Sequence, residues 1–215
     1  MKRKSFGAAM GLLAAFALWT LAVCFVDVRP IGPNGSTVGL AGINQFVHEL
    51  TGTNFLLYHI TDWLGLVPVG VCVGFGVLGL VQWIKGGHIG KVDGSILLLG
   101  GFYILTIGAY LLFEQVVINY RPVLIGGILE VSYPSSTTLL TMCVMPTAAI
   151  QFNARIKNRG FRRFVVFFVV AFTAFMVVGR ILSGVHWITD MIGGALLSAG
   201  LVLLYRAVTQ PKENT

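Results

Sequence analysis

The last third of the sequence holds a histidine and an aspartate whose spacing suits catalysis. His186 and Asp190 are four residues apart in the segment GRILSGVHWITD, at the start of a predicted helix. Residues at this spacing lie on one face of a helix, so the carboxylate can accept the proton of one imidazole nitrogen and orient the ring. This arrangement is typical of nucleophilic and general-base catalysis. A purely structural pair is the simpler interpretation, but an aspartate inside an apolar segment with no lysine nearby favours a functional role.

Two arginines and a pair of serines add the features of a phosphate site. Arg121 follows one apolar segment and Arg180 ends another, and guanidinium groups suit the bidentate binding of phosphate oxygens. In the stretch SYPSSTT, Pro134 is expected in the first turn of a helix whose N-terminus presents Ser135 and Ser136 to an anion. An ordinary helix cap would explain one serine, but it would not explain the two arginines.

Together these residues predict phosphoryl transfer to a nitrogen nucleophile. No cluster of carboxylates has the spacing of metal ligands, so we expect no metal ion and no other cofactor, and the arginines would neutralise the charge of the phosphate. The three cysteines are far apart in the sequence and are interpreted as packing residues.

The elements that must position these residues are membrane helices. The chain has 215 residues, is 56% hydrophobic and 11% charged, and has a mean hydropathy of +0.84, far from the composition of soluble proteins. Apolar runs of about 20 residues, long enough to cross a hydrocarbon core, recur along its length, and the first is interpreted as a span rather than a signal peptide. The sequence predicts an all-α fold, a single polytopic membrane helix bundle over residues 1–215. Its six expected spans are Phe6–Val26, Trp63–Ile84, Ser95–Phe113, Thr137–Phe152, Phe164–Leu182 and Trp187–Tyr205.

The basic residues predict the orientation of the bundle and argue against nucleic acid as a partner. The formal net charge is +7, but 12 of the 15 lysines and arginines fall on the side of the N-terminus, which the positive-inside rule assigns to the cytoplasm. Both termini are therefore expected to be cytoplasmic. The exceptions are Arg29, Arg121 and Arg180. The three segments that carry the candidate residues, EQVVINYRP, SYPSSTT and GRILSGVHWITD, then lie together on the outer side.

The only long connection is expected from Asp27 to Asp62, on the outer side. Within it the segment INQFVHEL, residues 43–50, has its apolar residues at helical spacing, which predicts a short amphipathic helix at the membrane surface. His48 and His59 belong to this connection. They are interpreted mainly as polar residues of the interface.

These motifs resemble those of the type 2 phosphatidic acid phosphatase (PAP2) family of integral membrane lipid phosphatases, whose bacterial members have a six-helix core. The third motif of that family, Arg, five residues, His, three residues, Asp, is matched by Arg180, His186 and Asp190. The resemblance implies that His186 is the nucleophile and that Asp190 orients it. The serine that usually precedes the arginine is Gly179 here.

Two positions depart from the family pattern. The first motif is Lys, six residues, Arg-Pro, and its lysine position holds Glu114. The second motif is Pro-Ser-Gly-His, and the histidine expected to protonate the leaving group is Thr137. An alcohol leaves as the anion of an acid about as weak as water, pKa ~15.7, so its protonation normally contributes on the order of 10² to 10⁴ in rate. A phosphate group, with a second pKa of about 6, scarcely needs a donor.

The sequence therefore predicts a lipid phosphatase of the outer face of a bacterial plasma membrane. The expected substrate is a lipid phosphate or diphosphate among the membrane lipids, with polyprenyl diphosphate favoured over phosphatidic acid and phosphatidylglycerophosphate. A proton supplied by His48 or His59 is a competing explanation for the missing donor. Two other functions stay open: a weakly active or inactive lipid-phosphate-binding relative, and a small anion transporter, although transporter sites usually lie near the membrane midplane.

Overall fold

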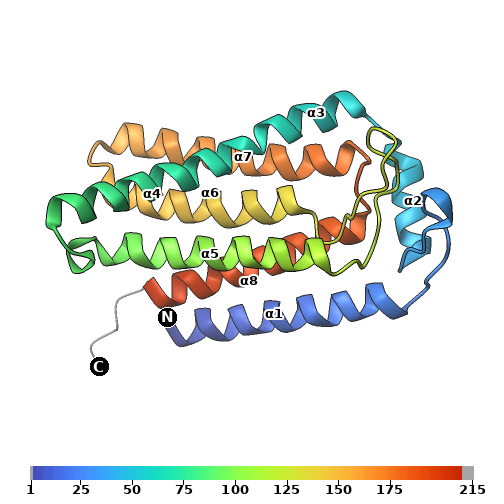
Figure 1. Cartoon of the computed structure of the whole chain (residues 1–215), viewed down its shortest axis with the longest axis horizontal. Helices are drawn as coiled ribbons and strands as arrows, with labels where there is room; N and C mark the ends of the chain where they lie inside the picture. Colours follow the sequence, from blue (N-terminus) through green and yellow to red (C-terminus); the bar gives the residue numbers. More distant parts are fainter. Residues whose placement is uncertain (1, 210–215) are drawn as a thin grey trace.

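The structure is a computed structural model that describes residues 2–209. It is built from helices that run side by side, with every long helix antiparallel to the next along the chain (Figure 1). Only three isolated bridges, and no strand, occur among the described residues. The expected all-α bundle is therefore confirmed. Its helices are α1 (Lys2–Phe25), α2 (Ala41–Thr51), α3 (Phe55–Leu64), α4 (Leu66–Gly86), α5 (Gly94–Gln115), α6 (Ser136–Arg155), α7 (Arg159–Leu182) and α8 (Ile188–Thr209).

Five segments of the described chain are long and apolar enough to cross a membrane: α1, α3 with α4, α5, α7 and α8. Large apolar side chains are exposed along their outward faces, which in water would be unfavourable and in lipid is expected. The protein is an integral membrane protein. The remaining predicted span, Thr137–Phe152, corresponds to α6, which packs against α4, α5, α7 and α8. Its interior position accommodates buried polar residues that make it less apolar, namely Thr138, Thr141, Thr147 and Gln151.

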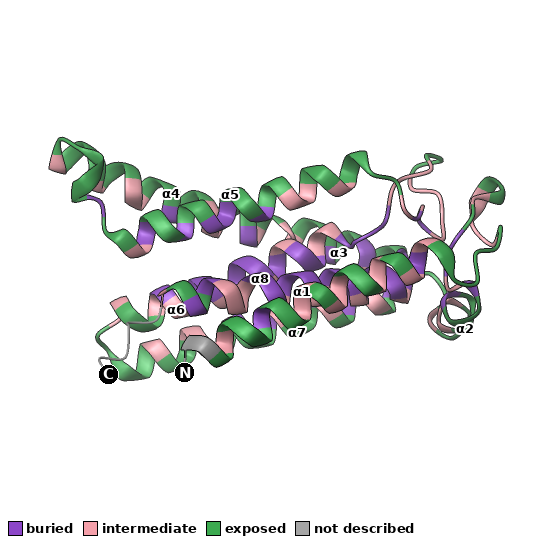
Figure 2. Cartoon of the chain, turned by 90° about the horizontal axis from the view of Figure 1, so that it is seen from below, coloured by how far each residue is buried: buried purple, intermediate pink, exposed green. Residues whose placement is uncertain are grey.

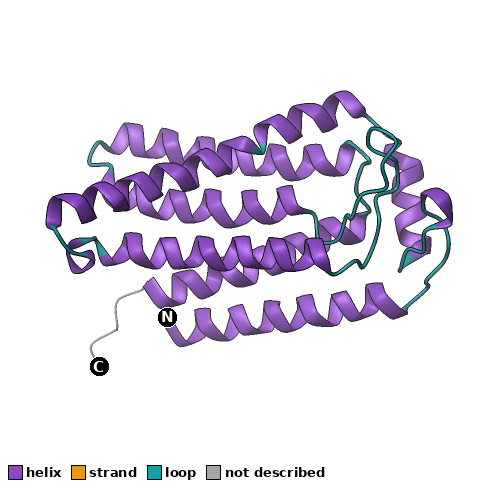
Figure 3. Cartoon of the chain, viewed as in Figure 1, coloured by secondary structure: helices purple, strands orange, loops and turns teal. Residues whose placement is uncertain are grey.

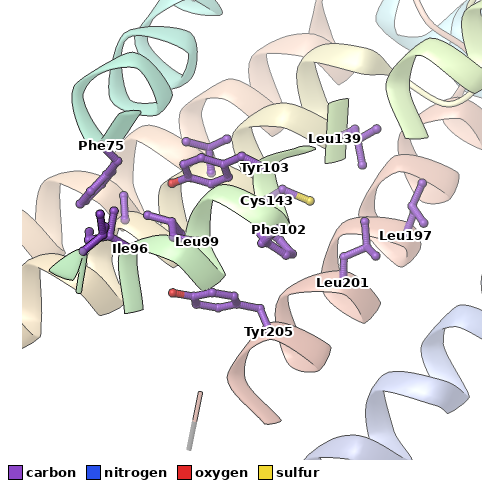
Figure 4. Packing of buried hydrophobic residues seen from close by; sticks show 13 residues of the cluster. Phe75, Ile96, Leu99, Phe102, Tyr103, Leu139, Cys143, Leu197, Leu201 and Tyr205 are labelled. Carbon is purple, nitrogen blue, oxygen red and sulfur yellow. The ribbon is translucent and has the colours of Figure 1, made fainter. Parts of the chain in front are cut away.

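The core of the bundle lies between α5, α6 and α8. Figure 2 shows buried residues concentrated along α6 and α8 in the middle of the molecule. The largest cluster brings Phe102 and Tyr103 of α5 against Cys143 of α6 and Leu201 of α8 (Figure 4). The buried Tyr205 hydroxyl accepts a hydrogen bond from Nε2 of Gln151 at 2.6 Å. This packing fixes α6 and α8 relative to each other. The N-terminal ends of both helices carry residues of the predicted site, Ser136 in α6 and Asp190 in α8.

The connections gather at the two ends of the bundle (Figure 3). One end holds the start of α1 and the α4–α5 and α6–α7 connections; the other holds α2 and the α5–α6 and α7–α8 connections (Figure 1). The motifs around Arg121, Ser135 and His186 all fall in the second group. The predicted convergence of the three segments at one end is thus what the structure contains.

The first long connection differs from its prediction. The amphipathic helix is present as α2, with Ile43, Phe46 and Leu50 exposed and Asn44 buried, so its apolar side faces outward as in an interfacial helix. The prediction that this connection reaches Asp62 was wrong, because α3 begins at Phe55 and forms one candidate span with α4. Its N-cap Asn54 accepts a hydrogen bond from the Leu57 amide at 2.9 Å, a standard start signal for a helix.

Candidate active site

The histidine and aspartate meet at the junction of α7 and α8. Nδ1 of His186 lies 3.6 Å from Oδ2 of Asp190, and both side chains are buried. The turn between the helices depends on Gly184, whose φ of +64° favours glycine and whose Cβ, if present, would lie 1.7 Å from the Gly52 carbonyl oxygen. His186 and Asp190 therefore approach each other as predicted, at ion-pair distance. They do so differently from the prediction, because His186 lies in the turn before α8 and not on a face of that helix.

Asp190 is held by donors on two sides. Its Oδ2 accepts the backbone N–H of Trp187 at 3.0 Å, and its Oδ1 accepts Nδ2 of Asn119 at 3.3 Å. Asn119 is itself buried and its backbone oxygen accepts the Ser132 amide at 2.9 Å. Sequence reasoning missed Asn119, although it stands two residues before Arg121 in INYRP.

The hydrogen bond between Arg121 and His186 decides the tautomer of the imidazole. NH1 of Arg121 lies 3.1 Å from Nε2 of His186, and a guanidinium has no acceptor. Nε2 must therefore accept, so the proton is on Nδ1, facing Asp190. Burial, reinforced by the charges of Arg121 and Arg180, lowers the pKa of His186 well below its usual 6.5. The ring is neutral at physiological pH, with its nucleophilic lone pair on Nε2.

The second arginine keeps two donors without a partner. NH2 of Arg180 lies 3.0 Å from Oδ1 of Asp62 and 2.5 Å from Oγ1 of Thr137. Nε and NH1 are buried and bond to no protein acceptor, although the side chain is only 2% exposed. Buried donors normally have partners, and these two have none among the described residues.

The start of α6 lies beside these groups, with one correction to the prediction. Ser135 is the N-cap and Ser136 the first helical residue, so Pro134 precedes the cap instead of forming the first turn. The Ser135 hydroxyl is buried without a partner and makes no capping bond, while the Ser135 amide donates to the Asp190 carbonyl at 3.2 Å. The close packing of Tyr133 against α8 needs the glycine at position 193, where a Cβ would lie 2.7 Å from the Tyr133 hydroxyl oxygen.

A polar pocket of about 480 Å³ opens next to Arg121. Ser136 and Glu114 line it, and they also line a smaller space of about 10 Å³ that reaches His186. That smaller volume is about one water-sized sphere, so the route to the histidine is narrow. Carboxylates missed by the sequence analysis flank the pocket: Asp62 pairs with Arg180, and Oε2 of Glu130 lies 2.9 Å from Nε of Arg121.

The remaining candidates are placed less centrally. Glu114 is exposed at the pocket wall, and it is Glu130 that pairs with Arg121. His48 packs edge-on against Trp187 with ring centroids 5.5 Å apart, and the exposed His59 lies beside Tyr58. Within residues 2–209, no group of three or more metal-ligating side chains is arranged to hold an ion.

Residues 99–213, which run from within α5 through the end of α8 and contain all three motifs, match the family model of the PAP2 superfamily. The chain belongs to the PAP2 superfamily. Its fold is similar to that of a transmembrane PAP2-type phosphatidylglycerolphosphate phosphatase from Bacillus subtilis, known from a crystal structure. The TM-score is 0.57 and the identity 16%, over 96% of this chain and 98% of that chain. No curated protein sequence matches this chain.

Membership of the PAP2 superfamily confirms the resemblance drawn from the motifs. The matched region contains Arg121, Ser135, Ser136, Arg180, His186 and Asp190 together with both departures, Glu114 and Thr137. It does not include α1 to α4. The contacts made by α3 with the arginines are therefore features of this chain beyond the matched family region.

Proposed function

We propose that this protein is a membrane lipid phosphatase that works through a phosphohistidine. Nε2 of His186 attacks the phosphorus atom, the bond from phosphorus to the leaving-group oxygen breaks, and the leaving group takes the electron pair. Water then attacks the phosphorus, the P–N bond breaks back to Nε2, and inorganic phosphate is released. Asp190, whose Oδ2 lies 3.6 Å from Nδ1, faces the Nδ1 proton and orients the ring throughout.

The observation that carries this proposal is the pairing of a neutral, buried His186 with guanidinium donors. The histidine offers its lone pair toward Arg121, while Arg180 has two unpartnered N–H donors. Oriented donors in a dry site stabilise the charge of a transferring phosphoryl group. Because NH1 of Arg121 contacts Nε2, we expect it to move onto the phosphate when substrate binds.

We further propose that the reaction needs no metal ion, because the two arginines supply the positive charge. The test is phosphate release by the purified protein before and after dialysis against EDTA. Equal rates support the proposal. A loss that Mg²⁺ restores would contradict it.

The favoured substrate is a polyprenyl diphosphate, whose leaving group is already acidic. Thr137 carries a hydroxyl that contacts Arg180, and with its high pKa a threonine is a poor proton donor. Phosphatidylglycerophosphate is the second candidate, supported by the fold shared with the Bacillus subtilis phosphatase. Rates with a C55 diphosphate, phosphatidylglycerophosphate and phosphatidic acid separate these. Equal rates for the diphosphate and phosphatidic acid would refute the preference.

Thr137→His tests the reason for this preference. Restoring the donor is expected to raise turnover of phosphatidic acid by about 10²-fold and to leave the diphosphate rate nearly unchanged. Ile128→Ala, an exposed substitution in the α5–α6 connection, is the control. If both substrates respond equally, the leaving-group explanation fails, and His48→Ala and His59→Ala then test the alternative donors.

The proposed location is the outer face of a bacterial plasma membrane. Supporting it, the described basic residues gather at the end of the bundle opposite the site, including Lys85, Lys91, Arg155 and Arg159. Single cysteines introduced at Gly126 and at His88, in a chain without its three native cysteines, test the orientation with an impermeant thiol reagent on intact cells. Labelling at position 126 alone is expected, and labelling at position 88 alone would reverse the topology.

A further inference from the structure

α3 reaches the phosphate site although neither the motifs nor the family match includes it. Tyr58 and Asp62 are four residues apart, so they lie on one face of this helix. The guanidinium carbons of Arg121 and Arg180 lie 5.8 and 5.0 Å from the centre of the Tyr58 ring. One turn further along, Asp62 pairs with Arg180 at 3.0 Å. Both residues line the polar pocket.

The two guanidiniums lie near the same Tyr58 ring, so the repulsion between their positive charges must be offset. Their positive charges repel, and burial removes the water that would screen them. An aromatic face attracts a cation within about 6 Å of its centroid, and the attraction strengthens where water is excluded. Tyr58 is 7% exposed, so its ring is placed to reduce the repulsion, and Asp62 holds one nitrogen of Arg180 while leaving Nε and NH1 open.

The position of α3 is fixed by contacts with the end of α7. The Asn54 amide donates to the Ser183 carbonyl at 2.9 Å. Further along, a Cβ on Gly179 would lie 2.8 Å from Cγ2 of Thr61, which is closer than two carbon atoms can pack. Gly179 stands where the resemblance expects serine. The glycine therefore permits the close approach that brings Tyr58 and Asp62 to the arginines.

We propose that Tyr58 and Asp62 are positioning residues of the phosphate site. Gly179, in place of serine, lets α3 pack close enough to α7 for both residues to contact the arginines. This inference rests on the proposed function only in naming the ligand a phosphate. It assigns to α3 a support for the arginines in a site whose usual lysine and histidine positions hold Glu114 and Thr137.

The first test pairs Gly179→Ser with Thr61→Ser, using inorganic phosphate as the probe on purified protein. Gly179→Ser is expected to weaken phosphate binding about tenfold, because the added side chain pushes α3 outward. Thr61→Ser removes the opposing methyl group and keeps the hydroxyl that donates to the Leu57 carbonyl at 2.9 Å. The double variant should regain most of the affinity. Unchanged binding in Gly179→Ser, or no recovery in the double variant, would overturn the proposal.

The second test compares substitutions on α3 itself. Tyr58→Leu is expected to weaken phosphate binding several-fold to about tenfold, whereas Tyr58→Phe keeps the ring and should bind as the unchanged protein does. Leu56→Ala, on an exposed position of the same helix, is the matched control. Equal binding by Tyr58→Leu and the unchanged protein, or equal losses in the Leu and Phe variants, would refute the role of the ring.

Asp62→Asn tests whether Asp62 positions Arg180 for phosphate or competes with phosphate for Arg180. A positioning carboxylate predicts weaker phosphate binding and a lower kcat in the variant, whereas a carboxylate that merely occupies Arg180 predicts tighter binding. The latter would overturn the proposal for Asp62. Because binding of inorganic phosphate needs no turnover, these outcomes are separate from a failure of the proposed function, which would appear as equal phosphate release by the unchanged protein and His186→Ala.

Discussion

The α7–α8 junction and the α5–α6 connection contribute to one site, but they follow the PAP2 pattern to different degrees. The junction keeps Arg180, His186 and Asp190. The side chains of His186 and Asp190 are buried, and Asp190 accepts hydrogen bonds from a backbone amide and a side-chain amide. The junction departs from the pattern only at Gly179, which precedes Arg180. The α5–α6 side carries the departures at the lysine and histidine positions, Glu114 at the end of α5 and Thr137 in the first turn of α6.

The difference separates two parts of the proposed reaction. Groups that make and orient the nucleophile are enclosed, so a change there disturbs packing as well as chemistry. Glu114 and Ser136 line the open pocket, where a change alters what binds with little effect on the fold. We infer that the covalent step is retained from the PAP2 superfamily and that substrate choice is where this chain diverges.

The largest effect is expected at the nucleophile. His186→Ala should reduce phosphate release by about 10⁴-fold or more, since no other group at the site can form the P–N bond. The matched control is His88→Ala, a histidine in the α4–α5 connection at the far end of the bundle (Figure 1), which should retain full activity. Turnover above a tenth of the normal rate in His186→Ala would place the nucleophile elsewhere.

Asp190→Asn should give the next largest loss, in kcat and not in KM. The amide cannot hold the Nδ1–H tautomer, and loss of this orientation costs about 10² to 10⁴ in rate in comparable sites. Steady-state kinetics measure it, with the exposed Glu49→Gln of α2 as control. If the loss appeared in KM alone, Asp190 would act on binding and the division between the two regions would fail.

The enclosed region was also the one that sequence could predict. His186 and Asp190 are close along the chain, so their short separation predicts that they meet, although His186 lies in the turn before α8 and not in the helix. The apolar runs likewise determined the bundle, because spans need about 20 apolar residues whatever they pack against.

The pocket side could not be predicted in the same way. Asp62 and Arg180 are 118 residues apart, and nothing local in either segment specifies their pairing. Residues 55–62 were interpreted as part of the connection, yet Tyr58 and Asp62 face the arginines. Leu56 on the same helix faces outward. The spacing of Tyr58 and Asp62 was the available signal for a helix.

Glu114→Lys is expected to have a moderate effect, and in the opposite direction. A lysine at the pocket wall replaces repulsion with a charge-assisted contact to phosphate, which should lower KM roughly tenfold. Gln115→Lys, the exposed neighbour outside the pocket lining, is the matched control. A KM that stays constant would show that Glu114 does not approach the bound phosphate, so that the pocket side differs less from the family than its sequence indicates.

The smallest expected effect is a shift in pH dependence, and it tests whether the two regions act on each other. Burial and the charges of Arg121 and Arg180 lower the pKa of His186, and only the neutral ring is nucleophilic. The acid limb of kcat/KM should therefore lie below pH 6.5, with activity lost as pH falls through the lowered pKa. Arg121→Gln removes one charge and should move that limb upward, whereas Arg121→Lys should leave it in place. A limb at or above pH 6.5 in the unchanged protein would mean that the working site is hydrated. A limb that Arg121→Gln does not move would mean that the α5–α6 side binds phosphate without tuning the nucleophile.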